Sequence, residues 1–87
     1  MMSGNNEIGF LKVGKYRIPI LKILYKSKYI PSEIAKKMNT TISQISRTLS
    51  ELEKYGLVIC ENPDMKKGRI YSITEEGIII LNKLGEN

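Results

Sequence analysis

A capped amphipathic helix over residues 41–55 constrains the fold more than any other feature of this sequence. Thr41 and Gln44 have the spacing of a capping box. In that motif the Thr41 hydroxyl accepts a hydrogen bond from the Gln44 N–H, and the Gln44 side chain accepts one from the Thr41 N–H. The apolar residues recur at helical spacing and form one buried stripe, Ile45, Leu49 and Leu52. Gly56 then ends the helix as a left-handed cap of the Schellman type.

Two shorter helices are predicted before it, over residues 18–27 and 31–38. Pro19 and Pro31 have no N–H to donate, so each fits only the first turn of its helix, where backbone N–H groups lack a helical partner. The apolar faces are Ile20, Leu21 and Leu24 in the first helix and Ile34, Ala35 and Met38 in the second. Asn39 tolerates the left-handed conformation, so we expect the chain to reverse there and lead directly into the third helix.

The second half of the chain predicts a β-hairpin followed by a final helix. Residues 57–61 and 69–73 are two β-like runs, and the loop between them, NPDMKKG, is rich in turn residues and has a basic tip. Thr74 caps the last helix, which runs to Leu84. The predicted fold class is therefore α+β and mostly α, with three helices, a hairpin and a C-terminal helix.

The first thirteen residues are predicted to form an N-terminal arm, and the domain itself covers residues 14–87. Residues 1–7 are polar and contain Gly and Asn, which favours disorder. Residues 8–13 are apolar but are interrupted by Gly9, and their pattern leaves helix and strand both open. The arm is therefore expected to be partly disordered.

The residue types present exclude most enzyme chemistry. The chain has no histidine and one cysteine, which excludes a Ser-His-Asp triad, a Cys-His pair, a zinc-cysteine cluster and a disulfide framework. We therefore predict a protein that binds a partner, with no enzyme activity, no cofactor and no metal. Cys60 is interpreted as a small strand residue rather than a redox switch, because the chain offers no second cysteine to pair with it.

The sequence also predicts a cytoplasmic protein. No apolar run approaches the roughly 18–20 residues that a membrane span needs. The first residues, MMSGNN, lack the basic and then apolar layout of a signal peptide.

The net charge of +5 is concentrated in the helical segment. Residues 14–55 hold nine basic and three acidic residues, net +6, whereas residues 75–87 hold one basic and three acidic residues, net −2. This asymmetry indicates a polyanion partner, such as nucleic acid, for the helical segment and a different role for the C-terminal end. At the start of the first helix, Tyr16 and Arg17 are open to two interpretations, contact with a phosphate or, for Tyr16, packing at the edge of the core.

The second and third helices together have the geometry of a helix-turn-helix reader. Opposite the buried stripe, the third helix carries Ser43, Arg47, Ser50 and Lys54, flanked by Gln44, Ser46 and Glu51. Short hydroxyls, an amide and a guanidinium can reach base edges or phosphates in a major groove. An ordinary solvated face would carry several Lys/Glu pairs, so the serines around one arginine favour DNA contact.

The stretch from Ile30 to Gly77 resembles the winged helix-turn-helix regulators of the MarR/ArsR type, particularly compact archaeal forms. The matching pieces are Ser32-Glu33-Ile34-Ala35, Ile45-Ser46-Arg47, Leu52-Glu53-x-x-Gly56-Leu57-Val58, Gly68-Arg69-x-Tyr71 and Thr74-Glu75-Glu76-Gly77. The resemblance covers about residues 16–84 and rests on the order and spacing of these pieces. In the family a Gly and an apolar residue are common where this chain has Asn39 and Thr40, and a Ser or Thr often stands in place of Ile30. We therefore expect a less tightly packed turn and a second helix that frays at its start.

The resemblance implies double-stranded DNA as the partner. Helix 41–55 would enter the major groove, and the hairpin loop 62–69, called the wing, would lie on the backbone or in the minor groove. The implied DNA contacts are Thr41, Ser43, Gln44, Ser46, Arg47, Ser50 and Lys54 from the helix, and Lys66, Lys67 and Arg69 from the wing. For the three wing residues, an ordinary solvated loop tip is the competing interpretation.

The final helix predicts a self-association face. Ile78 to Leu81 are four consecutive apolar residues, so Ile79 and Ile80 are expected to point partly away from the domain. The cover is either a second copy of the chain or the apolar stretch 8–13, and the acidic character of this segment favours a second copy over DNA. We predict a homodimer with the interface residues Ile79, Ile80 and Leu84.

These observations together predict a sequence-specific DNA-binding transcriptional regulator. The alternative is a winged-helix module that binds another protein in a transcription or replication assembly and makes no direct DNA contact. The sequence does not identify a small-molecule effector.

Overall fold

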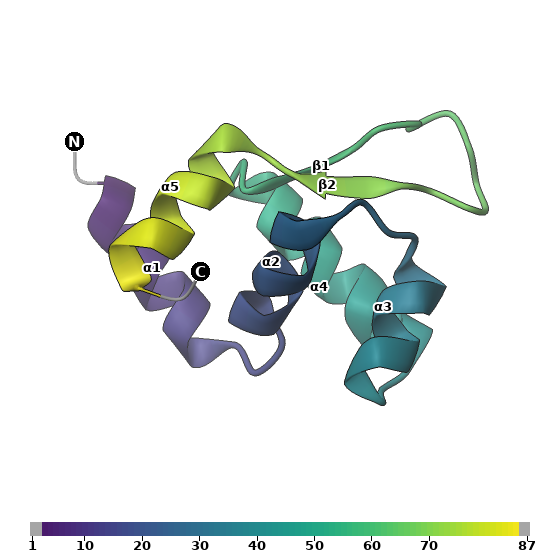
Figure 1. Ribbon diagram of the computed structural model, residues 1–87, viewed down its shortest axis with the longest axis horizontal. Helices are drawn as coiled ribbons and strands as arrows, with labels where there is room; N and C mark the ends of the chain where they lie inside the picture. The colour runs from purple at the N-terminus through teal and green to yellow at the C-terminus, as the bar shows by residue number, and fades with distance from the viewer. Residues whose placement is uncertain (1–2, 86–87) are drawn as a thin grey trace.

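The computed structural model describes residues 3–85 of the chain. Within these residues the elements are α1 (Ser3–Val13), α2 (Arg17–Lys26), α3 (Pro31–Met38), α4 (Ile42–Lys54), β1 (Val58–Cys60), β2 (Tyr71–Ile73) and α5 (Glu75–Leu84). The hairpin loop extends from one end of the molecule, while α1 and α5 lie at the other (Figure 1). The predicted mostly helical α+β fold is confirmed, with α1 as an additional helix. In the described part of the chain, no helix is long and apolar enough to span a membrane.

Helix α1 differs from the sequence prediction. Residues 3–7, expected to be disordered, are helical, and so is the apolar stretch 8–13. Met1 and Met2, the rest of the expected disordered segment, lie outside the described residues. The physical reason is tertiary packing, because α1 lies against α2 and α5 and its Leu11 is fully buried between them. Burial of an apolar face stabilises a helix whose local sequence is a poor helix former.

The turn between α3 and α4 is more firmly held than expected. Asn39 adopts the left-handed conformation (φ 54°), as predicted. The Thr40 N–H donates to the Ala35 carbonyl at 3.0 Å, and the Thr40 hydroxyl donates to the Tyr16 hydroxyl at 3.1 Å. The expectation of a loosely packed turn is therefore wrong, because Thr40 ties the turn to α3 and to the start of α2.

The first turn of α3 has a substitute for the missing Ser or Thr cap. The carboxylate of Glu33 accepts a hydrogen bond from the backbone N–H of Ile30 at 3.1 Å. The carboxylate also lies at the positive end of the helix dipole, where an acidic side chain is favourable. Glu33 thus holds the helix start that the sequence led us to expect to fray.

The two ends of α4 match the sequence prediction closely. The Thr41 hydroxyl accepts from the Gln44 N–H at 3.2 Å, which is the first bond of the predicted capping box. The reciprocal bond, from the Thr41 N–H to the Gln44 side chain, is not formed among the described residues, so that half of the prediction is wrong. Gly56 has φ 74°, its N–H donates to the Glu53 carbonyl at 2.9 Å, and the Leu57 N–H donates to the Leu52 carbonyl at 3.0 Å. These two bonds are those of a Schellman motif. The position of α4 is therefore fixed at both ends by local signals.

The hairpin strands are shorter than the two β-like runs of the sequence. β1 pairs antiparallel with β2, with Ile59 opposite Ser72. Beyond Cys60 one more backbone bond follows, from the Glu61 N–H to the Ile70 carbonyl at 2.7 Å. The side chain of Asn62 comes next: its Oδ1 accepts from the Ile70 N–H at 2.7 Å and its Nδ2 donates to the Gly68 carbonyl at 3.2 Å. Asn62 therefore closes the base of the wing in place of further strand pairing.

Helix α5 packs inward through residues that the sequence placed differently. Ile80 is 1% exposed and Leu81 is fully buried, so the expectation that Ile80 points away from the domain is wrong. The reason is that α1 and α2 both lie against α5, which widens the covered sector of the helix. Ile79 remains 42% exposed, as predicted.

The first turn of α5 approaches the backbone of Leu57 closely because residue 77 is glycine. A Cβ added at Gly77 would lie 2.4 Å from the Leu57 carbonyl oxygen.

Candidate nucleic-acid interface

The outer face of α4 is exposed along its length. Its buried side carries the predicted stripe of Ile45, Leu49 and Leu52, each at 0% exposure, and packs on the core. All seven residues predicted for DNA contact on this helix and its cap are exposed, Thr41, Ser43, Gln44, Ser46, Arg47, Ser50 and Lys54. The one hydroxyl of the helix that turns inward is that of Thr48, which donates to the Gln44 carbonyl at 2.8 Å. The helix therefore presents a continuous polar surface.

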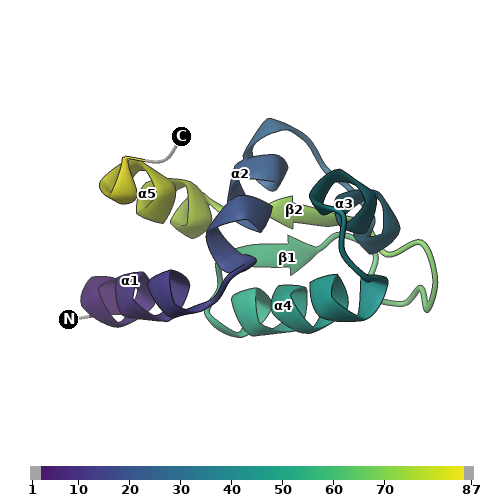
Figure 2. The same ribbon diagram turned by 90° about the horizontal axis from the view of Figure 1, so that it is seen from below.

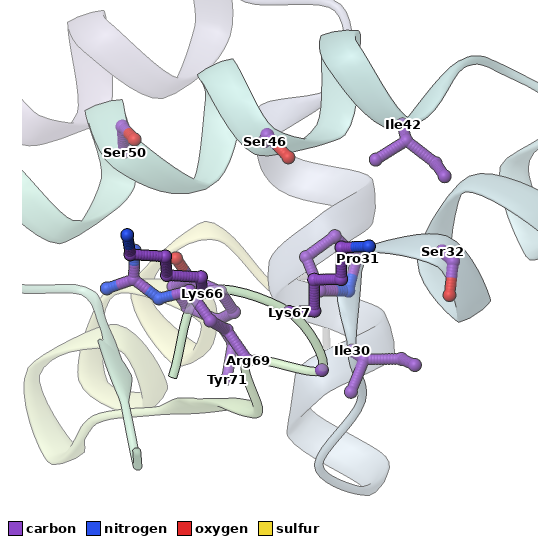
Figure 3. Close-up of a pocket in the computed structure, with 11 residues that line it drawn as sticks. Ile30, Pro31, Ser32, Ile42, Ser46, Ser50, Lys66, Lys67, Arg69 and Tyr71 are labelled. Carbon is purple, nitrogen blue, oxygen red and sulfur yellow. The ribbon is translucent and has the colours of Figure 1, made fainter. Parts of the chain in front are cut away.

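This exposed face divides into two rows, one that lines a cavity and one that lies outside it. Ile42, Ser46 and Ser50 are spaced four residues apart, so they lie one above the other on the helix and all line a cavity of about 530 Å³. Figure 3 shows these three side chains on one helix above the wing residues. Arg47, one residue further along, is not part of the cavity lining. Within residues 3–85 its guanidinium has no hydrogen bond or ion pair, so it is available to a partner.

The wing supplies the opposite wall of the same cavity. Lys66, Lys67 and Arg69 line it together with residues at the start of α3 (Figure 3). The structure thus brings two of the seven predicted helix and cap residues, Ser46 and Ser50, together with the three predicted wing cations. The other five do not line this cavity, Thr41, Ser43, Gln44, Arg47 and Lys54. The result is an open groove with hydroxyls on one wall and three cations on the other.

Arg69 lies two residues before β2 and is oriented by one residue of each hairpin strand. Its Nε donates to the sulfur of Cys60 at 3.4 Å, and its guanidinium carbon lies 6.0 Å from the centre of the Tyr71 ring. The hydrogen bond to Cys60 is the main cause that raises the pKa of Arg69 above its usual value. Cys60 itself is buried and lies in β1. Arg69 is therefore a positioned cation at the base of the wing, whereas Lys66 and Lys67 are exposed at its tip.

A second polar cluster holds the outer side of the hairpin. The Glu61 carboxylate accepts from the Ser72 hydroxyl at 2.6 Å and forms an ion pair with Lys28 at 3.3 Å. These two partners, the hydroxyl first, lower the pKa of Glu61 below its usual value. Lys28 is therefore used within the fold, and its charge connects the α2–α3 loop to the wing.

Arg17 is used inside the domain instead of facing a phosphate. Its guanidinium forms an ion pair with Glu51 at 3.0 Å and donates to the Phe10 carbonyl at 2.6 Å. It also lies 3.8 Å from the centre of the Phe10 ring, which stacks on Tyr55 at 3.9 Å. Arg17 thus joins α1, α2 and α4. Tyr16 packs at the edge of the core, which was one of its two interpretations.

The groove and the α1/α5 surface lie at opposite ends of the molecule. Figure 2 shows the wing loop beside the start of α4 at one end and the paired helices α1 and α5 at the other. On α5, Ile79 is 42% exposed and Leu84 is partly buried, whereas Val13 (80% exposed) is the last residue of α1, at the end of that helix that leads into α2. Among the described residues, no group of three or more His, Cys, Asp or Glu side chains is placed to hold a metal ion.

A family model described as winged helix-turn-helix matches residues 15–87. The chain belongs to the winged helix-turn-helix family. Among solved structures, this winged helix-turn-helix chain is similar to a MarR-family regulator from Neisseria meningitidis, with 20% identity, a TM-score of 0.75, and coverage of 93% of this chain and 58% of that one. It is also similar to the homodimeric winged helix-turn-helix DNA-binding domain of a possible ArsR-family regulator from Mycobacterium bovis. In that case the identity is 22%, the TM-score is 0.74, and the coverage is 95% and 75%. The predicted MarR/ArsR resemblance is thereby confirmed at the level of the fold.

One sequence relative has a different description. The chain is 41% identical to the riboflavin kinase of Pyrococcus furiosus over 54 residues, which are 62% of this chain and 24% of that protein. This winged helix-turn-helix chain therefore matches about a quarter of the kinase, and about three quarters of that protein lies outside the match.

Two residues of the interface were missed from the sequence. Asn62 closes the wing through its side chain, and the signal for it was an Asn directly before Pro63 in a turn-rich loop. Ile42 lines the groove and is 54% exposed, although it is apolar. The sequence feature that indicates its position is the spacing of four residues between Ile42 and Ser46, which places both side chains in one row of the helix.

Proposed function

We propose that this chain is a sequence-specific DNA-binding transcriptional regulator, in which α4 enters the major groove and the wing contacts the backbone or the minor groove. The observation that carries the proposal is the convergence of Ser46 and Ser50 of α4 and the three wing cations on one groove, beside the second exposed polar row of the same helix. A surface with hydroxyls and cations fits a polyanion. The MarR-family and ArsR-family structures of similar fold support the same function.

The two rows of α4 suggest two kinds of contact. Arg47, Ser43 and Gln44 face outward and are suited to base edges, because a guanidinium binds guanine in a bidentate manner and an amide binds adenine. Ser46 and Ser50 face the wing cations across the groove, and they are suited to phosphates of the strand that passes between the major and minor grooves. Affinity then comes mainly from the groove and selectivity from the outer row.

A homodimer through the α1/α5 end completes the proposal. This end lies opposite the groove, so two copies joined there would leave both α4 helices free for DNA (Figure 2). Ile79 and Leu84 stay in the proposed interface, and Ile80 leaves it because its side chain is in the core. The Mycobacterium bovis domain of similar fold is described as homodimeric, which supports this arrangement. Such a dimer would read two half-sites about one helical turn apart, and we place it in the cytoplasm with the DNA.

The test is a gel-shift titration over a salt series, with random duplex DNA and with duplexes that the chain selects from a random pool. Each phosphate contact contributes about −0.9 to the slope of log K against log salt concentration. Lys66→Ala should reduce that slope by about one and weaken all sequences equally, whereas Arg47→Ala should reduce the preference for the selected sequence. Lys83→Ala removes the same charge from α5, away from the groove, and should change neither quantity.

The competing function is a protein-interaction module without DNA contact. It predicts no binding at low salt to either kind of duplex. That result would overturn the regulator proposal. Analytical ultracentrifugation of the wild type and Ile79→Asp tests the dimer separately: the wild type should sediment as a dimer and the variant as a monomer, and a wild-type monomer at high concentration would refute it.

A further inference from the structure

Ile42 is an exposed apolar side chain in a groove of mixed lining, which holds three cations and two serines of the same helix as well as the less exposed Ile30 and Pro31. It is the first residue of α4 and is 54% exposed. Of the large apolar side chains that are exposed in the described residues, it alone lines the cavity with Lys66, Lys67 and Arg69 (Figure 3). Its neighbour one turn along the same row is Ser46.

The fold does not need an isoleucine at this position. The core contacts of α4 are made by the buried stripe that begins at Ile45, and its N-terminus is held by the Thr41 hydroxyl. A β-branched residue is also a weaker helix former than alanine. The side chain therefore exposes apolar surface and lowers helix propensity without a core contact in the isolated domain, and a partner seated in the groove would bury it.

The surroundings of Ile42 restrict the chemistry of that partner. An apolar protein surface laid on the groove would desolvate the wing cations without pairing them, which is costly. Duplex DNA satisfies both requirements, because its phosphates pair with the cations while its major groove offers one apolar group, the C5-methyl of thymine. Residues at the start of a recognition helix are also those that reach base edges.

We infer that Ile42 is a specificity-determining residue that contacts the C5-methyl group of a thymine in each half-site. The inference rests on the proposed DNA-binding function and adds a base identity to it. Its β-branched side chain has one strongly preferred rotamer in a helix, so little side-chain entropy is lost on contact. Removal of one methyl group from water corresponds to about a fourfold change in affinity.

The experiment uses the full chain and a duplex that it selects from a random pool. Each thymine of the half-site is replaced in turn by deoxyuridine, which lacks only the methyl group. We expect one such replacement to weaken wild-type binding about fourfold and the others to have little effect. Ile42→Ala should bind the thymine duplex about as weakly as the wild type binds the uracil duplex, and it should not distinguish the two.

The matched control is Ile59→Ala, which removes an isoleucine of similar exposure (50%) from β1, outside the cavity lining. It should retain the full thymine-over-uracil preference. Circular dichroism at constant protein concentration checks that both variants are folded. Since Ile42 contributes no core contact, its replacement should leave the spectrum and the melting temperature unchanged within about 3 °C.

The outcomes separate this inference from the function on which it rests. If the chain selects no DNA, the proposed function and the inference both fail. If it selects DNA but the half-site contains no thymine, or uracil binds as well as thymine at every position, only the inference fails. An equal loss with uracil in the wild type and in Ile42→Ala would also overturn it, because the methyl group would then be contacted by another residue.

Discussion

Replacement of Gly77 by alanine tests how closely α5 approaches the hairpin. Gly77 lies in the first turn of α5, where its N–H donates to the Thr74 hydroxyl at 3.1 Å. An added Cβ would lie 2.4 Å from the carbonyl oxygen of Leu57 and 2.7 Å from Cγ1 of Ile73. The first contact is with backbone, and that carbonyl also accepts the Thr74 N–H at 3.0 Å. Relief of the clash therefore requires α5 to move away from β1.

Two opposing effects determine the size of the change. Overpacking in a well-packed region typically costs about 1–3 kcal/mol. Alanine in a helix gains up to about 1 kcal/mol over glycine. Because the clash involves a backbone atom rather than a flexible side chain, we expect a net loss of about 1–2 kcal/mol in the free energy of unfolding.

The matched control is Gly9→Ala in α1, where an added Cβ has no atom within 4 Å. This variant keeps the propensity gain without the clash, so it should be stabilised by about 0.5–1 kcal/mol. Thermal unfolding by circular dichroism at fixed protein concentration measures both variants, and a domain of this size shifts by about 4–8 °C per kcal/mol. The reasoning is refuted if Gly77→Ala melts at or above the wild-type temperature while Gly9→Ala behaves as expected.

Three further predictions concern the polar contacts. Arg17→Ala should lower the free energy of unfolding by about 2 kcal/mol, because it leaves Glu51 and the Phe10 carbonyl without their charged donor; urea titration measures this, and an unchanged midpoint would contradict it. Glu61 has a lowered pKa in the folded state, so the unfolded state binds its proton more readily and stability falls as pH drops from about 5 through the folded-state pKa. Glu61→Gln should flatten this fall in melting temperature between about pH 5 and pH 3, and a profile parallel to the wild type would refute it. Asn62→Ala should weaken DNA binding several-fold with little loss of helical signal, since the wing loses its hydrogen bonds to Ile70 and Gly68; equal DNA affinity in a gel shift would show that the wing does not depend on it.

The elements with local signals were predictable from the sequence. The bounds of α4 follow from Thr41, Gly56 and an apolar stripe within thirteen residues, and all three signals act within a few residues of the helix. The exposed positions on its outer face follow from helical geometry alone. For the same reason the hairpin and the caps of α5 could be located without tertiary information.

The features that depend on distant contacts were not predictable. Helix α1 is stabilised by its packing on α2 and α5, and nothing in residues 3–7 themselves indicates a helix. Four consecutive apolar residues leave the inward face of α5 undetermined, so the burial of Ile80 depends on which helices cover it. The Arg17–Glu51 pair joins residues 34 positions apart, and the sequence alone could not remove Arg17 from the candidate phosphate contacts.

The groove was predictable in its parts but not in its assembly. The sequence indicated serines on one helix and cations on a loop, yet their common cavity depends on how the hairpin folds back toward α3 and α4. Ile42 escaped notice because an apolar residue in an amphipathic helix is normally assigned to the core.

The position of Arg17 has a consequence for the geometry of a dimer. One guanidinium contacts α1, which belongs to the proposed dimer end, and α4, which belongs to the proposed DNA end. In the proposed dimer the two ends would therefore move as one rigid body, and the separation of the two α4 helices would be set within each subunit instead of by a hinge. An operator whose half-sites are one base pair too far apart would have to be accommodated by twisting the DNA or by sliding at the subunit boundary. In the proposed DNA-binding dimer, the spacing between half-sites would therefore be recognised as well as their bases.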